Sequence, residues 1–375
     1  MINKRRVCII ELGTSHYNDV FSQLELLREH FEVHVIAPPR LFNMDLFSAT
    51  TQLYHALPLH ELRARSRWIR LARLPLTLWR IRKYCARINA DAIIFNTTFT
   101  LIDLWLIAAL LPRGKTFQVI HNYQRFLNPV AFRFFKWFTN NMVLSEDVFE
   151  YIRKTHDTAG KLAFFLPIFF KSFMATCPER QPKWKGGRAT FNLGVFGGIE
   201  QSRRDYQGLI DAVARLQATG ASINFRIHLI GSAPPEFEET IRQQGLKEIV
   251  SVYGYCSFAD MFALAENMDL VFFLIDSNVH NFRYYNKYKV SGTSVLLKTF
   301  RKVGVSSDEF LVDRSLQNTV FYYHGADVGE ILKKIARGEI TKAMIAEMER
   351  RYSDVRLLSF ETQQRQLIAA LGIAQ

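Results

Sequence analysis

Residues 285–300 read YNKYKVSGTSVLLKTF, a polar segment that passes through a small turn into an apolar run. Its candidate ligand-binding residues are Tyr288, Lys289, Ser291, Gly292 and Thr293. Free N–H groups at the start of a helix can be capped by a Ser or Thr side chain, or they can bind a phosphate with a lysine nearby. The segment therefore predicts a helix that begins near Ser291, with either a simple cap or an anion site at its start.

Two further loops in the same half of the chain have compositions suited to binding a phosphate. The segment FGGIEQSRRDYQGLIDA contains Gly197 and Gly198, which allow a ligand to approach the backbone closely. It also contains Arg203 and Arg204, whose guanidinium groups can make bidentate contacts to phosphate oxygens. The segment YGYCSF adds Tyr255, against which a base could lie. All three loops follow predicted strands, so they open onto one edge of a sheet and favour a phosphate site over unrelated glycine turns and solvated arginines.

The first half of the chain holds the candidate catalytic groups. His16 and Asp19 follow the first predicted strand, and His121 follows a later one. A base that removes a proton from a hydroxyl group could be an imidazole or a carboxylate at such a position. Each residue also has a structural alternative, as a binding group or as a hydrogen-bonded polar side chain. No metal ion is expected, because arginines and helix N–H groups could neutralise a leaving diphosphate.

The elements that must position these residues alternate between strands and helices. Short apolar strands separated by helices indicate parallel sheets covered on both faces. In the first half we predict a helix at 20–30 and strands at 7–12, 32–37, 92–96, 117–121 and 141–144. In the second half we predict strands at 191–196, 224–230, 249–253, 270–275 and 303–306, with helices at 206–216, 236–244, 258–267 and 293–300.

This alternation predicts an α/β protein of two doubly wound, Rossmann-like domains that face a central cleft, where ligands bind at the carboxyl ends of strands. The expected boundaries are residues 1–165 for the first domain, 166–186 for a proline-containing linker and 187–352 for the second domain. The last segment, 353–375, is expected to include a helix at about 355–371 that packs back on the first domain.

Composition sets further limits. The chain has 375 residues, 49% of them hydrophobic and 22% charged, which is typical of a globular protein with two domains. Its four cysteines are widely spaced, so neither a zinc site nor a disulfide framework is indicated. No apolar run approaches the roughly 20 residues of a membrane-spanning helix, and the N-terminal segment reads as a buried strand and not as a signal peptide. These features predict a cytoplasmic protein.

The net charge of +13 is concentrated in the first half, where the first 170 residues hold 22 basic and 13 acidic side chains. Between Arg63 and Arg87 there are nine Lys and Arg residues and no acid, interleaved with Trp68 and Trp79. Basic amphipathic helices with tryptophan lie in anionic membrane interfaces, and residues 125–138 have a similar composition. The alternative is a pair of ordinary helices with solvated arginines. Nucleic acid is not an expected partner, because no nucleic-acid-binding motif is present.

The second half resembles the donor-binding domain of GT-B-fold glycosyltransferases, particularly family 4 and its relatives. The resemblance covers roughly residues 190–310, including FGGIEQSRRDYQGLIDAVARL, FRIHLIG and the helix that begins with SGT. It implies that Arg204 and the start of this helix hold the donor diphosphate. Retaining members of the family carry a Glu-x7-Glu pair, and the matching positions hold Tyr288 and Leu296. Ile199 stands where the family has an arginine.

The resemblance implies a hexosyltransferase that moves a sugar from a nucleotide diphosphate sugar to a lipid-linked or anionic glycan, as in bacterial lipopolysaccharide, capsule or exopolysaccharide synthesis. The missing acids favour inversion at the anomeric carbon. No cofactor is expected besides the donor substrate, and the protein would lie peripherally on the inner face of the plasma membrane. The alternatives are a nucleotide-sugar epimerase of the same fold and a non-catalytic binding protein that has retained the fold.

Overall fold

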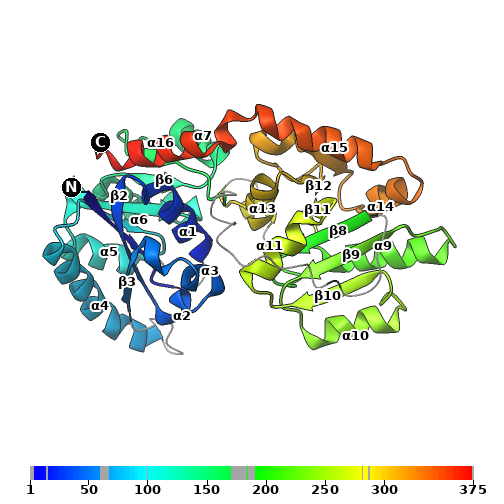
Figure 1. Ribbon diagram of the computed structural model, residues 1–375, viewed down its shortest axis with the longest axis horizontal. Helices are drawn as coiled ribbons and strands as arrows, with labels where there is room; N and C mark the ends of the chain where they lie inside the picture. The colour runs from blue at the N-terminus through cyan, green and yellow to red at the C-terminus, as the bar shows by residue number, and fades with distance from the viewer. Residues whose placement is uncertain are drawn as a thin grey trace. The chain divides into compact units, whose positions relative to one another are not determined.

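The computed structural model describes residues 4–13, 16–59, 67–98, 100–169, 184, 191–280, 282–285 and 288–373. The chain divides into two compact units. Unit 1 comprises Met1–Cys177 and Leu357–Gln375, and unit 2 comprises Pro178–Arg356. Unit 1 is therefore built from two separate segments of the chain, and unit 2 lies between them in sequence (Figure 1).

Among its described residues, unit 1 contains a seven-stranded parallel sheet in the order β3-β2-β1-β4-β5-β6-β7. The strands are β1 (Arg5–Ile10), β2 (Phe31–Ala37), β3 (His55–Pro58), β4 (Ala92–Phe95), β5 (Thr116–Ile120), β6 (Asn141–Val143) and β7 (Leu162–Phe164). The side chains of β4 and β5 are buried along their whole length, because helices cover both faces of a parallel sheet.

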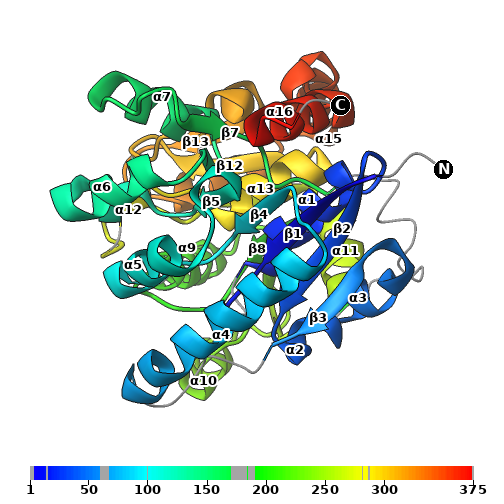
Figure 2. The same ribbon diagram turned by 90° about the vertical axis from the view of Figure 1, so that its left-hand side faces the viewer.

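The helices of unit 1 form two layers. Three of them, α4, α5 and α6, lie side by side along one face of the sheet (Figure 2). On the other face, α16 packs against α1, and the Gln363 side chain accepts a 2.6 Å hydrogen bond from the Leu166 backbone N–H. The helices are α1 (Tyr17–Leu27), α2 (Pro39–Phe42), α3 (Asp45–Ser48), α4 (Arg67–Arg87), α5 (Leu101–Leu110), α6 (Pro129–Trp137), α7 (Glu146–Thr155) and α16 (Phe360–Leu371).

The described part of unit 2 contains a six-stranded parallel sheet in the order β10-β9-β8-β11-β12-β13. Its strands are β8 (Phe191–Phe196), β9 (Phe225–Ile230), β10 (Val250–Gly254), β11 (Leu270–Phe272), β12 (Val303–Ser307) and β13 (Val320–Tyr323). Its helices are α9 (Tyr206–Ala218), α10 (Pro235–Gln243), α11 (Phe258–Glu266), α12 (Phe282–Tyr285), α13 (Gly292–Phe300), α14 (Gly329–Ala336) and α15 (Lys342–Arg350).

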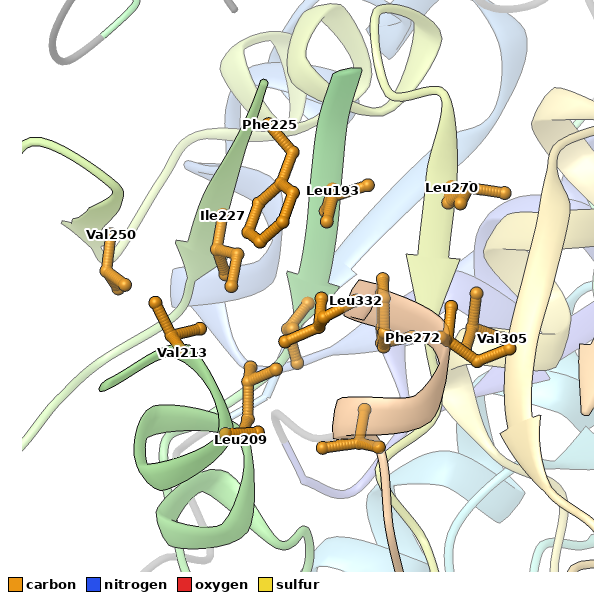
Figure 3. Packing of buried hydrophobic residues seen from close by; sticks show 14 of the residues in the cluster. Leu193, Leu209, Val213, Phe225, Ile227, Val250, Leu270, Phe272, Val305 and Leu332 are labelled. Atoms are coloured by element: carbon orange, nitrogen blue, oxygen red, sulfur yellow. The ribbon is translucent and has the colours of Figure 1, made fainter. Parts of the chain in front are cut away.

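The core of unit 2 shows why these segments fold as they do. Leu209 and Val213 of α9 and Leu332 of α14 point toward the sheet, where they meet Leu193 and Ile227 (Figure 3). The spacing of four residues between Leu209 and Val213 places both side chains on one face of the helix. Burial of this apolar face is what holds α9 and α14 against the strands.

Most of the predicted elements are confirmed, with boundaries within a few residues. Three strands were not predicted, namely β3, β7 and β13. Strands β3 and β7 lie at the two edges of the first sheet, where side chains are half-buried or exposed and leave a weak apolar pattern. The predicted C-terminal helix begins at Phe360, because residues before it form 3-10 turns at Arg351–Asp354 and Arg356–Leu358.

Candidate functional site

The loop after β8 is built for a close approach to its backbone. Gly197 has a φ of +116°, a conformation that favours glycine. Gly231, at the end of β9, packs so tightly on this loop that a Cβ atom there would lie 2.0 Å from the Gly197 carbonyl oxygen. The Tyr206 hydroxyl lies 3.4 Å from the carbonyl oxygens of both Gly197 and Gly198. The loop geometry is therefore fixed from two sides.

Arg204 lies directly beneath this glycine loop. Its side chain is buried, with 9% exposed, and a terminal nitrogen would lie 2.9 Å from a Cβ atom at Gly197. The guanidinium donates one long hydrogen bond, of 3.4 Å, to the Thr293 hydroxyl, and its buried Nε has no hydrogen-bond partner. Within the described residues, no carboxylate pairs with it. A buried cation without a counter-charge is costly, so this position is suited to an anionic ligand.

The start of α13 supplies the second part of this anion site. Ser291 is the N-cap, and its side chain accepts a 3.2 Å hydrogen bond from the Thr293 backbone N–H. The predicted helix start is thus confirmed, and Gly292 is exposed in the first turn. Because Thr293 also contacts Arg204, the guanidinium and the helix N-terminus meet at one point. Both favour a negative charge there.

The other candidate donor-site residues differ in exposure and in their partners. Arg203 is 51% exposed and forms an ion pair of 2.9 Å with Glu200. Tyr255 is 72% exposed after β10. Lys289 is half-buried, with its ammonium group 4.8 Å from the ring centroid of Tyr285. Tyr288 is half-buried in the turn before α13. The three loops thus lie along one sheet, and the structure places Arg204 next to Gly197 and in contact with the start of α13.

At two of the three positions that depart from the family pattern, the side chain is apolar and buried. Ile199 is buried and belongs to the hydrophobic core of unit 2. Leu296 is buried on α13. The third such position holds Tyr288, which is half-buried in the turn before α13.

Sequence reasoning missed two buried carboxylates next to this region. Asp205 caps α9, accepting a 2.9 Å hydrogen bond from the Gly208 N–H and a 3.0 Å hydrogen bond from the Asn278 side chain. Asp276 follows β11, and burial together with Asp205 raises its pKa to about 6. The acid that ends the apolar run VFFLID is a signal that could have identified Asp276.

In unit 1, the three candidate catalytic residues come together. The rings of His16 and His121 stack with their centroids 3.5 Å apart. Asp19 Oδ2 lies 3.7 Å from His16 Nδ1 and 3.4 Å from His121 Nδ1. The backbone carbonyl of Asn96 lies 2.7 Å from His121 Nε2 and can only accept, so Nε2 carries a proton and Nδ1 faces Asp19.

A fourth group, Glu11, extends this cluster and was not among the predicted residues. Glu11 is fully buried at the end of β1, where it accepts hydrogen bonds from the Thr97 hydroxyl at 2.5 and 2.6 Å and from the Gly13 N–H at 2.7 Å. Burial raises its pKa to about 7, although these hydrogen bonds act in the opposite direction. Burial, and next the charge of Glu11, raise the pKa of Asp19 as well. An acid that ends the apolar run VCII was the signal in the sequence.

Two clusters in unit 1 have the residue types of metal sites. In the first, the nearly parallel rings of His16 and His121, with 25° between their planes, do not let both lone pairs converge on one ion. In the second, Glu32 lies 3.1 Å from His34 and 3.4 Å from His55, but it also pairs with Arg6 at 3.0 Å. The ring orientation in the first cluster and the ion pair with Arg6 in the second both disfavour metal ligation.

No described helix combines the length and the apolar character that crossing a bilayer requires. The basic segment predicted at Arg63–Arg87 corresponds to α4, which begins at Arg67, and Arg63 lies outside the described residues. The second basic segment, 125–138, forms α6 and the end of the preceding 3-10 helix.

Known proteins resemble the chain in structure. No family model and no curated protein match its sequence. Sucrose-phosphate synthase from Thermosynechococcus elongatus superposes with a TM-score of 0.65 at 14% identity, covering 98% of this chain and 100% of that one. HepE from Anabaena, solved in complex with UDP and glucose, has a TM-score of 0.64 at 14% identity, with coverages of 98% and 99%. A putative UDP-N-acetylglucosamine 2-epimerase from Listeria monocytogenes has a TM-score of 0.61 at 12% identity, with coverages of 98% and 96%.

These similarities extend over almost the whole length of each protein, and they include both a synthase and a putative epimerase. At such identities they establish the fold and not the reaction. The predicted architecture of two doubly wound domains is confirmed, and the closer likeness to family 4 stays a prediction. The chain therefore has the GT-B fold.

Proposed function

We propose that the protein is a glycosyltransferase that uses a nucleotide diphosphate sugar. The observation that carries this proposal is the buried Arg204 guanidinium, which has no carboxylate partner among the described residues and meets the N-terminus of α13. A diphosphate would satisfy both groups at once. The proposal is supported by the fold shared with HepE, which was solved with UDP and glucose.

In the proposed reaction, the acceptor hydroxyl oxygen forms a bond to the anomeric carbon while the bond from that carbon to the diphosphate breaks. The diphosphate keeps the electron pair, and Arg204 and the α13 N–H groups stabilise its charge without a metal ion. The hydroxyl proton passes to the imidazole of His16, which stacks on His121, and Asp19 stabilises the imidazolium that forms. Since the positions of the paired family glutamates hold Tyr288 and Leu296, we propose inversion at the anomeric carbon.

The proposed acceptor is a lipid-linked or anionic glycan of bacterial surface-polysaccharide synthesis, at the inner face of the plasma membrane. Three neighbouring helical segments support membrane attachment, namely α4, α5, and α6 with the 3-10 helix before it. All three expose large apolar side chains, and α4 and α6 also carry arginines and lysines. Trp79 is 50% exposed on α4, and Trp105 is 59% exposed on α5. The other exposed apolar side chains of this surface are Leu76, Leu101, Ile102, Leu127 and Val130.

Vesicle co-sedimentation tests this attachment. We expect binding to anionic vesicles that weakens with added salt and is reduced about tenfold when Trp79 and Trp105 are both changed to Ser. The matched control is Leu311→Ser, which removes an exposed apolar side chain from unit 2. Equal binding by the double variant and the control would contradict the attachment.

The donor site is tested by calorimetric titration with UDP and with GDP. We expect Arg204→Ala to weaken binding of the preferred nucleotide about 100-fold, because a charge-assisted contact is lost and the phosphate loses its counter-charge. The control is Arg203→Ala, which removes an exposed arginine already paired with Glu200 and is expected to change affinity less than threefold. Unchanged affinity in Arg204→Ala would overturn the proposed donor site.

The second candidate is a nucleotide-sugar epimerase, which the fold shared with the Listeria protein favours. Incubation with UDP-N-acetylglucosamine in the absence of any acceptor separates the two, since an epimerase would produce a second sugar isomer by NMR. A non-catalytic binding protein would bind nucleotide with no turnover of any donor. Release of the free nucleotide only when an acceptor or water receives the sugar would support the transferase.

A further inference from the structure

Unit 1 contains a cavity of about 540 Å³. Its lining does not include the histidine cluster, and no step of the proposed reaction uses it. One wall is apolar and is formed by Pro39, Leu57, Pro58 and Leu59, at the ends of β2 and β3. The other wall is one side of α4 and carries Thr77, Arg80, Lys83, Tyr84 and Arg87. The spacing of these five residues places them along one side of the helix.

The helical wall is strongly cationic. Within the described residues, none of Arg80, Lys83 and Arg87 forms an ion pair. Two of them rest on aromatic rings, since Lys83 lies 5.3 Å from the Trp79 ring centroid and Arg87 lies 5.1 Å from that of Tyr84. These contacts orient the side chains and leave their charges without an anion.

One acidic group, Glu32, acts electrostatically on Tyr84 of this wall and is already engaged. Glu32 pairs with Arg6 at 3.0 Å and with His34 at 3.1 Å, and these contacts lower its pKa. His34 in turn shares a 2.9 Å hydrogen bond with the Tyr84 hydroxyl, which fixes Tyr84 at the cavity wall. The lining itself contains no carboxylate. The cavity therefore combines three uncompensated cations with an apolar wall.

We propose that this cavity binds the phosphate-bearing head of a lipid. The phosphate would lie against Arg80, Lys83 and Arg87, and the first carbons of the acyl or prenyl chain would lie against Leu57 and Leu59. An inorganic anion would contact only the cationic wall, and a neutral apolar ligand would contact only the apolar wall. A phosphate monoester with an apolar chain uses both. Exposed Leu76 and Trp79 lie on the same helix, next to Thr77 and Arg80, which is consistent with a bilayer on this side of unit 1.

The test is a calorimetric titration of the full chain with soluble probes below their micelle concentrations. We expect dihexanoyl phosphatidic acid to bind at least tenfold more tightly than either glycerol 3-phosphate or inorganic phosphate, because only the lipid also buries apolar surface. Dihexanoyl phosphatidylcholine, whose head carries no net charge, is expected to bind at least tenfold more weakly than the phosphatidic acid. Equal affinity for the lipid and for inorganic phosphate would overturn the proposal.

Two variants locate the binding. Arg80→Ala with Arg87→Ala should reduce affinity for dihexanoyl phosphatidic acid at least tenfold, and Leu57→Trp should do the same by filling the cavity while leaving the three cations in place. The control, Arg82→Ala with Arg133→Ala, removes two exposed arginines that do not line the cavity. If the cavity variants and the control have the same affinity for dihexanoyl phosphatidic acid, the proposed site is wrong. An unchanged thermal unfolding midpoint of unit 1 shows that the variants are folded. Since UDP titration reports on unit 2 alone, an unchanged UDP affinity shows that the outcome is independent of the donor site.

Discussion

The loops after β1 and β8 hold the same topological position in the two units and have opposite chemistry. Both strands lie third in their sheets, whose strand orders are 3-2-1-4-5-6-7 in unit 1 and 3-2-1-4-5-6 in unit 2. At this position the direction of winding reverses and ligand sites form. The loop after β1 leads into buried carboxylates and stacked histidines, beginning with Glu11 and Asp19. The loop after β8 leads into a buried guanidinium, Arg204, and meets the start of α13.

This difference shows that the fold determines where a ligand site forms, and that the residues of each loop determine the charge of that site. In unit 1, burial raises the pKa of Glu11 to about 7, and burial together with the charge of Glu11 raises the pKa of Asp19 above its usual range, so this region is suited to exchanging protons. In unit 2, an arginine cannot release its proton, so burial can be offset only by an anion. One region is therefore suited to proton transfer, and the other to holding a charged leaving group.

The largest expected effect separates the two regions by function. Asp19→Asn should lower the rate of sugar transfer about 1,000-fold, because the imidazolium formed on proton uptake loses its counter-charge. The same variant should bind UDP as well as the unchanged protein does, since the donor site belongs to unit 2. Turnover is measured as nucleotide release from a panel of nucleotide sugars, and binding by calorimetry. If Asp19→Asn loses both turnover and UDP binding, the proposal that unit 1 transfers the proton and unit 2 binds the donor is wrong.

The second effect concerns the pH dependence of stability. Because the pKa of Glu11 is raised from 4.5 to about 7 on folding, its contribution to stability is greatest below pH 4.5 and is lost as the pH rises through 7. This change amounts to about 3 kcal/mol. Glu11→Gln should remove it, so the stability lost between pH 4.5 and pH 8 should be smaller in the variant by about that amount.

Urea unfolding at both pH values measures this difference. The control is Glu29→Gln, which changes an exposed acid in the same unit and should leave the pH dependence as it is. If Glu11→Gln follows the same pH curve as the control, Glu11 is ionised in the folded state, and the contrast between a proton-storing and an anion-binding loop no longer holds.

The smallest effect tests the glycine loop of unit 2. Gly197→Ala should weaken UDP binding about tenfold, because its φ of +116° strains an L residue and the new methyl group would press on Arg204 at 2.9 Å. Gly198→Ala is the matched neighbour, since a Cβ atom there would be in ordinary contact with Glu200 at 3.4 Å. Equal affinities for the two variants would show that the loop does not set the position of Arg204.

The fold could be predicted from the sequence to a large extent, because parallel strands with two covered faces leave short apolar runs such as VCII and AIIF. The strands that were missed, such as β3 with its largely exposed residues His55–Pro58, lack this signal. Their pairing depends on the neighbouring strand, which a local pattern does not contain.

The candidate sites could be predicted only in part. Residue type and position after a strand were enough to select Arg204, Asp19 and His121. They could not distinguish Arg204, which is buried, from Arg203 beside it, which turns to Glu200, because that choice depends on the direction of each side chain. Glu11 was missed because an acid at the end of a strand usually reads as the first polar residue of a loop.

The return of α16 to unit 1 has a consequence for the order of folding during synthesis. All the residues of unit 2 have been synthesised once the ribosome has passed residue 356, so this unit can form its core early. Unit 1 begins the chain, but the Leu166 N–H and the apolar side of α1 wait for Gln363 and the rest of α16 to emerge. Unit 1 is therefore translated first but completes its fold after unit 2.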